Sequence, residues 1–211
     1  MTLLYTPAML VFPYAAAFGL WGHGADIGIV GTLVTLHFAK RVLECLFLHR
    51  YSGTINVGTT LMITCIYLAA ALGFLAMTTV ARHPDQGQAP VGGSAAPGVA
   101  VFAAGQLGNG YHHWLLANLR KPGEKAYAVP KGGLFSLVCC PHYLFEVIAF
   151  VGLGLVTGHA GALSIAWTSA GYLAGRAFAT MQWYEAKAKK GALKGGASLP
   201  AGWKRVIPFV F

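Results

Sequence analysis

Apolar residues in this chain come in long runs that are separated by short polar or glycine-rich segments. The hydrocarbon core of a bilayer requires about 20 consecutive apolar residues for one helical crossing. Runs that approach this length divide the chain into segments near 4–21, 27–49, 59–81, 97–119, 133–157 and 161–184. The pattern therefore predicts an all-α fold, a polytopic membrane helix bundle with about six transmembrane helices.

The second segment fits this pattern least well, because Lys40, Arg41 and Glu44 would be costly in lipid. We expect that face to look into the protein or a wet cavity, or the helix to lie partly in the interface. The Gly-, Pro- and Ala-rich residues 83–98 predict a surface loop rather than a domain boundary. One membrane-embedded domain over residues 1–211 results, with a basic cytosolic tail over 185–211.

Charge sets the expected orientation. With 56% hydrophobic and 10% charged residues, the chain is too apolar for a single soluble core, and its formal net charge is +9. The cations follow the even-numbered segments, at Arg50, in the 120–131 loop and in the tail, whereas the opposite loops hold Arg82 alone. The even-numbered loops should therefore face the cytosol, where they suit anionic lipid headgroups or a phosphate-bearing soluble ligand. The tail lacks interleaved aromatics and a recognisable nucleic-acid-binding fold, so we expect no nucleic-acid partner.

Metal and Rossmann-type chemistry find little support in the sequence. The four cysteines, Cys45, Cys65, Cys139 and Cys140, are scattered or adjacent in apolar runs, which favours core packing over a zinc site. Eight histidines without recurring HxxxH or HxxHH clusters argue against a di-iron site, so no metal is expected. A G-x-G-x-x-G fingerprint followed by a soluble helix is also absent from the sequence, which excludes a Rossmann-like cofactor site.

The most informative stretch is the polar, basic region that begins at Asn109 and ends at Glu146. It gathers cations around the turn signals Pro122-Gly123 and Pro130, then re-enters an apolar run at Gly132-Gly133. The four cations between its apolar flanks are Arg120, Lys121, Lys125 and Lys131. We interpret this layout as an anion-binding rim.

Glu146 carries the strongest functional signal. It lies near the middle of the fifth segment, where an unpaired carboxylate is expensive and usually functional. The structural alternative is a pairing with Arg176, Arg41 or a histidine. Asn109, Arg176 and Tyr184 could converge with it on one cytosol-facing cavity.

Several blocks of this sequence resemble the steroid 5α-reductase family, which includes the trans-2-enoyl-CoA reductases of fatty-acid elongation. The blocks are LHFAKRVLECLFLHRYSG (36–53), LRKPGEKAYAVPKGGLF (119–135), PHYLFEVIAFVG (141–152), GRAFATMQWY (175–184) and the terminal KRVIPFVF (204–211). The resemblance implies a seven-helix fold, here without its first helix, and NADPH-dependent reduction of a carbon–carbon double bond conjugated to a carbonyl. It also implies a lipid substrate that enters from the bilayer, with membrane lipids around the protein.

The resemblance further implies a set of site residues. Glu146 corresponds to a buried glutamate close to the nicotinamide and the substrate. The positions implied to grip NADPH are Asn109, Arg120, Tyr127, His142, Arg176 and Tyr184, and Arg41 or Arg50 could clamp phosphate from the second helix.

The chain departs from the family at its expected acid. The family's HY motif supplies a tyrosine hydroxyl to the substrate carbonyl, but here the motif is His37-Phe38, and phenylalanine cannot donate a hydrogen bond. Tyr5 matches an early catalytic glutamate of the steroid enzymes and could donate to the carbonyl instead, with His37 as the next candidate.

Substrate and location stay open within this framework. We favour a 3-oxo-5α-steroid 4-dehydrogenase-type reductase, with a trans-2-enoyl-CoA reductase as the alternative. An isoprenylcysteine-type methyltransferase and a catalytically inactive relative are further alternatives. The expected location is the endoplasmic reticulum membrane for a eukaryotic source and the inner membrane for a bacterial one, and the oligomeric state is left open.

Overall fold

The computed structural model describes residues 2–20, 25–50, 55–80, 95–119 and 127–207. These residues form six α-helices, with short 3-10 and π turns at helix ends and in loops. The helices are α1 (Thr6–Ala17), α2 (Ala25–Leu43), α3 (Val57–Val80), α4 (Ala95–Asn118), α5 (Pro141–Thr157) and α6 (Ala160–Lys189). The expected all-α class is confirmed.

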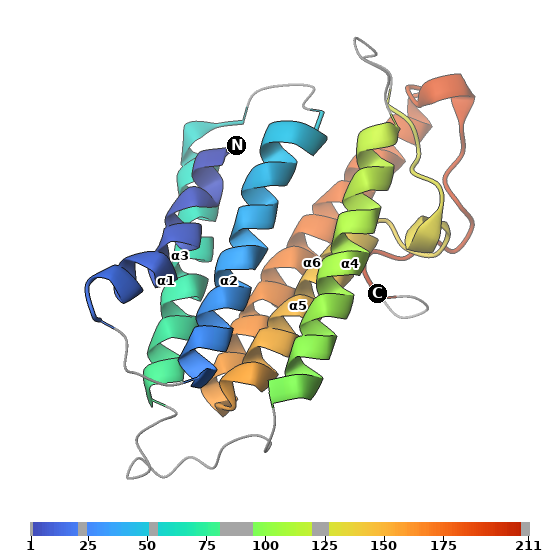
Figure 1. Cartoon of the computed structure of the whole chain (residues 1–211). Helices are drawn as coiled ribbons and strands as arrows, with labels where there is room; N and C mark the ends of the chain where they lie inside the picture. Colours follow the sequence, from blue (N-terminus) through green and yellow to red (C-terminus); the bar gives the residue numbers. More distant parts are fainter. Residues whose placement is uncertain (1, 21–24, 51–54, 81–94, 120–126, 208–211) are drawn as a thin grey trace.

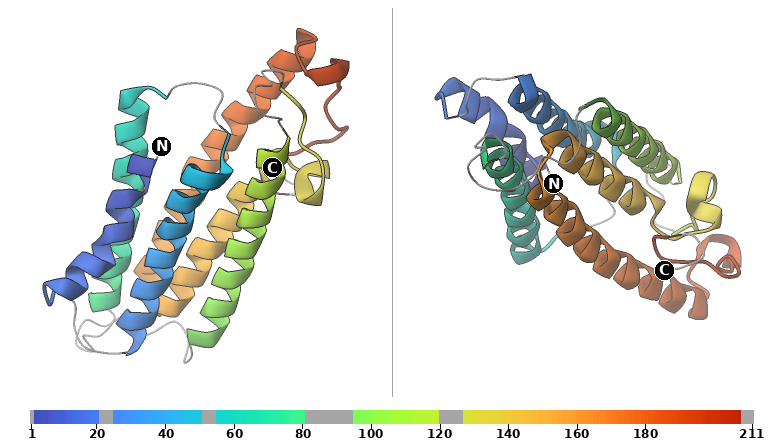
Figure 2. Two further views of the ribbon diagram at one scale, coloured as in Figure 1. Left: turned by 45° about the horizontal axis from the view of Figure 1, so that its top comes forward. Right: turned by 90° about the horizontal axis from the view of Figure 1, so that it is seen from below.

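The helices run alternately up and down, and α5 occupies the centre (Figures 1 and 2). It packs on α4 and α6 most extensively and also contacts α2 and α3, whereas α1 packs on α2 and α3. In the view from below, α5 lies between α4 and α6, with the α1–α3 group to one side. A polar side chain of α5 that points into the bundle is therefore shielded from the surroundings of the protein by several neighbouring helices.

Glycines allow α4 and α5 to approach closely. A Cβ atom at Gly105 would meet the backbone nitrogen of Ala149 at 2.4 Å, and one at Gly152 would meet the backbone nitrogen of Phe102 at 2.4 Å. A Cβ atom at Gly98 would likewise meet the backbone nitrogen of Val156 at 2.7 Å. These backbone contacts fix the position of α5 along the axis of α4, and therefore also the position of Glu146.

The start of the fifth helix differs from the prediction. A helix was expected from residue 133, but residues 133–140 form a short 3-10 turn, η4 (Gly133–Ser136), followed by non-helical backbone up to Cys140. Gly132 and Gly133 both have positive φ, and Pro141 occupies the first turn of α5, where its missing N–H costs nothing. The apolar run alone did not reveal this turn.

The C-terminal segment packs against the η4 loop. The main chain of Cys139 donates to the carbonyl of Lys204 at 2.7 Å, and the indole of Trp203 donates to the carbonyl of Phe135 at 2.7 Å. Farther out, the amide of Lys194 donates to the carbonyl of Tyr127 at 2.8 Å. The expected tail from 185 thus begins as the last turn of α6 and continues, over 193–206, as a segment tied to the 127–140 loop.

The membrane topology receives partial support. Among the described residues, one helix, Val57–Thr79, is both long and apolar enough to cross a bilayer, with a mean hydropathy of 2.1. Thr6–Ala17 and Pro141–Thr157 are apolar but shorter. Charged and polar side chains such as Lys40 on α2 and Asn109 on α4 make those helices less apolar. Six transmembrane crossings remain a prediction.

Candidate active site

A cavity of about 300 Å³ lies between the helices, toward the end of the bundle at which α2, α4 and α6 finish. Its volume is at the lower limit of typical small-molecule sites. Every one of the six helices, or the turn that flanks it, contributes to the wall. The polar residues of the wall are Tyr5, Arg41, His49, Arg50, Tyr67, His113, His142, Tyr143, Glu146, Tyr172 and Arg176.

Glu146 is one of the most deeply buried of these residues, with 1% of its surface exposed. Its Oε1 accepts a hydrogen bond of 2.9 Å from the hydroxyl of Tyr67 on α3. Within the described part of the chain, no cation forms an ion pair with Glu146, so Tyr67, rather than Arg176, Arg41 or a histidine, is its partner. A buried carboxylate with one neutral donor retains acceptor capacity for a ligand.

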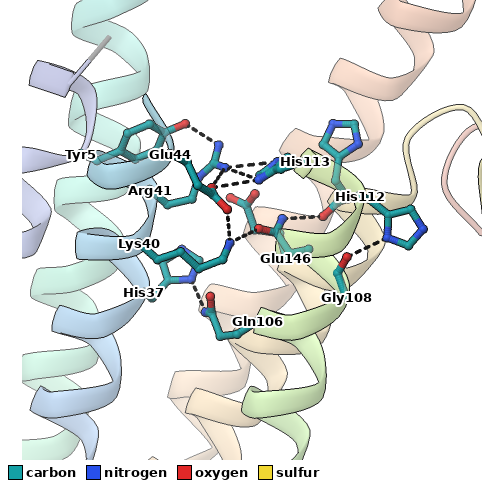
Figure 3. Close-up of polar contacts among 12 residues, drawn as sticks. Tyr5, His37, Lys40, Arg41, Glu44, Gln106, Gly108, His112, His113 and Glu146 are labelled. Atoms are coloured by element: carbon teal, nitrogen blue, oxygen red, sulfur yellow. Dashed lines mark hydrogen bonds and ion pairs between the residues drawn. The ribbon is translucent and has the colours of Figure 1, made fainter. Parts of the chain in front are cut away.

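Arg41 at the end of α2 and Glu44 in the turn η2 (Glu44–Leu48) that follows are buried inside the protein, as expected from their cost in lipid. Arg41 donates from Nη1 to Oε2 of Glu44 at 2.7 Å and from Nη2 to the hydroxyl of Tyr5 at 2.8 Å (Figure 3). His113 on α4 completes the cluster, since its Nδ1 lies 2.9 Å from both Arg41 Nη1 and Glu44 Oε2. The cluster joins α1, α2 and α4 at the cavity wall.

Asn109 acts as a bridge between helices in this structure. It accepts from Lys40 Nζ at 2.6 Å and donates to the main-chain carbonyl of His142 at 2.9 Å. Lys40 also contacts Glu44 Oε1 at 2.6 Å. The predicted cofactor residue Asn109 therefore does not line the cavity but holds the start of α5 in place. The ring of His142, at that start, forms part of the cavity wall.

Six of the predicted site residues meet at the cavity, namely Tyr5, Arg41, Arg50, His142, Glu146 and Arg176. His37 does not line it: the ring is buried, Nδ1 lies 2.6 Å from the Gln106 amide, and Nε2 has no partner. Tyr127 and Tyr184 lie in a separate cluster around Trp203. Arg120 is outside the described residues.

Sequence reasoning missed Tyr67 and His113 as members of the site. The only signal for Tyr67 was one phenol in a mostly apolar run, and for His113 its place in a histidine pair on α4. Neither signal indicates a partner, because Tyr67 and its partner Glu146 are 79 residues apart in sequence, and His113 and its partner Glu44 are 69 residues apart.

One group of described residues, Glu44, His49 and His113, has ligand atoms within 4.8 Å of one another. Both oxygens of Glu44 are already engaged by the cations Lys40 and Arg41. A divalent cation would have to displace or approach these positive groups, and the Coulomb repulsion disfavours it. We assign no metal to this cluster.

The profile of the 3-oxo-5-alpha-steroid 4-dehydrogenase family matches residues 57–211, from the first turn of α3 to the end of the chain. The protein belongs to this family, and the resemblance noted in the sequence is confirmed. Tyr5, His37 and Arg41 precede the matched region.

The relatives include both 3-oxo-5-alpha-steroid 4-dehydrogenases and enoyl-CoA reductases. The chain is 38% identical over 114 residues to 3-oxo-5-alpha-steroid 4-dehydrogenase 2 of Macaca fascicularis. The aligned residues cover 54% of this chain and 42% of the relative. It is 33% identical over 125 residues to the very-long-chain enoyl-CoA reductase of Dictyostelium discoideum, over 58% of this chain and 40% of the relative. A putative enoyl-CoA reductase of Trypanosoma brucei brucei is 33% identical over 59% of this chain and 42% of the relative. The chain thus spans less than half the length of these relatives.

Proposed function

We propose that this protein is a membrane-embedded oxidoreductase that uses NADPH to reduce a carbon–carbon double bond conjugated to the carbonyl of a lipid. The favoured substrate class is a 3-oxo-Δ4-steroid. The observation that carries the proposal is one cavity with a hydroxyl donor, Tyr5, and a buried carboxylate, Glu146, on its wall. Membership of the family supports reductase chemistry for such a site.

The outer surface supports a bilayer environment. Large apolar side chains on the sides of the bundle are exposed, and a surface this apolar is unusual for a monomer in water. Examples from α2 to α6 are Leu36, Leu43, Leu61, Leu72, Leu107 and Trp167. A lipid substrate would reach the cavity from the surrounding bilayer.

The distribution of cations supports a cytosolic location for the cavity end. The final turns of α2, α4 and α6 lie at this end of the bundle (Figure 1), and most cations of the described chain follow or flank these turns in sequence, as the positive-inside rule expects for a cytosolic face. The residues outside the helix cores are Arg50, Lys131, Lys187, Lys189, Lys190, Lys194, Lys204 and Arg205. A soluble cofactor would arrive here, at the endoplasmic reticulum membrane in a eukaryote or the inner membrane in a bacterium.

NADPH would supply a hydride, and the residues on the wall fit its parts. Arg176 and Arg50 line the cavity and offer guanidinium groups for phosphate, and the buried Nδ1 of His142 has no partner within the described residues. Glu146 would accept from the carboxamide or orient a substrate oxygen. The basic segment with Arg120 would complete the rim.

The reduction needs two contributions from this chain, a hydrogen-bond donor and a low-dielectric site. As hydride adds to the β-carbon, the π electrons move toward the carbonyl oxygen, and the Tyr5 hydroxyl donates a hydrogen bond to that developing enolate. The α-carbon then takes a proton from solvent, which restores the carbonyl and leaves a saturated bond. Tyr5 is buried among the packed helices, so the donor acts in a low-dielectric site.

A trans-2-enoyl-CoA is the second substrate candidate. The similarity to enoyl-CoA reductases and the excess of cations at the cavity end favour it, since coenzyme A carries phosphates of its own. A steroid needs an apolar slot and no second phosphate site.

Turnover assays on the purified, detergent-solubilised protein test the proposal. NADPH oxidation is followed with a Δ4-3-oxosteroid and, separately, with a long-chain trans-2-enoyl-CoA. Turnover of one substrate that Glu146→Gln abolishes would support the reductase and select its branch. A protein that binds no NADPH would contradict the proposal.

A further inference from the structure

We infer that Arg41 is a positioning residue of the reaction, which acts through the hydroxyl of Tyr5, and does not clamp a cofactor phosphate. The inference rests on the reductase function proposed above. It concerns which hydroxyl group donates a hydrogen bond to the carbonyl oxygen of the substrate, and why the hydrogen of that hydroxyl is available for this bond.

The direction of the Arg41–Tyr5 hydrogen bond is fixed by chemistry. A guanidinium has donors and no acceptor, so Arg41 Nη2 must donate to the Tyr5 oxygen across their 2.8 Å contact. A phenol has one donor hydrogen, and this contact leaves it unused. Among the described residues, no acceptor takes the Tyr5 hydrogen, and Tyr5 lines the cavity. A ligand carbonyl is the group that can accept it.

Tyr67 has the opposite assignment. Its hydroxyl donates to Glu146 Oε1 at 2.9 Å, so its hydrogen is taken and its oxygen can only accept. The Tyr5 and Tyr67 rings are neighbours, with centroids 5.0 Å apart. Of these two adjacent hydroxyls, only the one held by Arg41 is prepared to receive a carbonyl oxygen.

Arg41 is held in a geometry that suits this task and opposes phosphate binding. Nη1 is occupied by Glu44 and His113, Nη2 by Tyr5, and the guanidinium carbon lies 4.9 Å from the centre of the Tyr5 ring. Only 8% of Arg41 is exposed. Nε has no partner among the described residues but is buried, so a phosphate could bind bidentately only if the surrounding packing opened, whereas donation into the Tyr5 oxygen polarises its O–H bond toward an acceptor.

A double-mutant cycle separates the two roles. Tyr5→Phe, Arg41→Gln and the double variant are purified in detergent, and kcat and the Kd for NADPH are measured for each with the substrate that the wild type turns over. We expect Tyr5→Phe to lower kcat about a hundredfold, as for loss of one oxyanion donor. Arg41→Gln should also lower kcat, with the Kd for NADPH changed less than about twofold, and the double variant should be no slower than Tyr5→Phe.

Two results would overturn the inference: a Kd for NADPH that rises tenfold or more in Arg41→Gln at unchanged kcat, or losses of kcat that multiply in the double variant. Arg176→Gln is the contrasting variant, because a phosphate or cofactor contact there should raise the Kd. If Arg41→Gln does not fold, Arg41→Lys replaces it in the same cycle, since the lysine ammonium keeps the positive charge but lacks the planar fork of the guanidinium. A wild type that transfers no hydride would defeat the reductase proposal itself, an outcome distinct from either of these.

Discussion

The hydroxyl of Tyr67 on α3 donates to Oε1 of Glu146 on α5 across 2.9 Å, at the centre of the helix bundle. Tyr67 also packs edge-on against Phe38, with ring centroids 5.8 Å apart. Phe38 on α2 has no hydroxyl, whereas its neighbour Tyr67 on α3 has one, and this hydroxyl is hydrogen-bonded to the buried carboxylate of Glu146. Among the described residues, Tyr67 is the hydrogen-bond partner of Glu146, and the carboxylate lines the cavity, where its second oxygen could accept from a ligand.

Replacing Tyr67 by phenylalanine removes one oxygen and leaves the ring. Because a hydrogen bond to a charged group contributes about 1.5–3 kcal/mol, we expect kcat to fall roughly tenfold or more, and the melting temperature to fall as well. Tyr14→Phe on the exposed face of α1 is the matched control and should behave as wild type. Steady-state kinetics and thermal unfolding in detergent measure both effects. Equal kcat values for the two variants would exclude a role for the Tyr67 hydroxyl.

The glycine contacts between α4 and α5 predict a strong effect of one methyl group. Gly105→Ala places a Cβ 2.4 Å from the backbone nitrogen of Ala149, so the helices must separate. We expect a loss of about 1–3 kcal/mol, seen as a lower melting temperature in detergent. Gly171→Ala on α6 meets nothing within 4 Å and should be neutral or slightly stabilising. If both alanines have the same effect, the close packing of α4 on α5 is not a determinant of stability.

The indole of Trp203 ties the C-terminal segment to the η4 loop. Trp203→Phe leaves the carbonyl of Phe135 without this donor, which should cost about 1–3 kcal/mol and loosen the loop. Tryptic cleavage after Lys131 and Lys204 should become faster, as followed by mass spectrometry. Trp167→Phe, at a position that is 77% exposed, serves as the control. Unchanged cleavage relative to that control would mean that the loop is held by other contacts.

Lysines at the end of α6 and beyond it distinguish the two substrate candidates. Lys189, Lys190 and Lys194 are exposed at the cavity end of the bundle. Their combined replacement by glutamine should raise the KM for a long-chain enoyl-CoA severalfold, because the phosphates of coenzyme A lose their counter-charges, and should leave the KM for a steroid unchanged. A triple variant with both KM values unaltered would remove the charge argument for an acyl-CoA substrate.

Much of the fold could be predicted from local pattern. Long apolar runs located all six α-helices of the described chain, and Arg41 and Glu44 are buried in the protein, which is one of the alternatives that their cost in lipid indicated. The start of α5 was missed because residues 133–140 are as apolar as the helix that follows. Two positive-φ glycines and Pro141 mark the turn there, but hydropathy does not register backbone conformation.

The candidate site was less accessible to sequence reasoning. Glu146 and Arg176 were indicated by the scarcity of ionisable groups in apolar segments, and both line the cavity. Tyr67 was not indicated, since its role depends on a partner that lies on another helix. His37 was named for its motif, yet packing turns its ring toward Gln106 and away from the cavity. Pairings between distant helices follow from tertiary packing, which a single sequence does not display.

The most direct test of the proposed reduction follows the hydride itself. The purified protein is given NADPH that carries two deuterium atoms at C4 of the nicotinamide, with a Δ4-3-oxosteroid or a long-chain trans-2-enoyl-CoA as acceptor. We expect a saturated product with one deuterium at the former β-carbon, and none from Glu146→Gln beyond trace levels. A saturated product without deuterium, or no product from either acceptor while NADPH is bound, would contradict hydride transfer to a conjugated double bond.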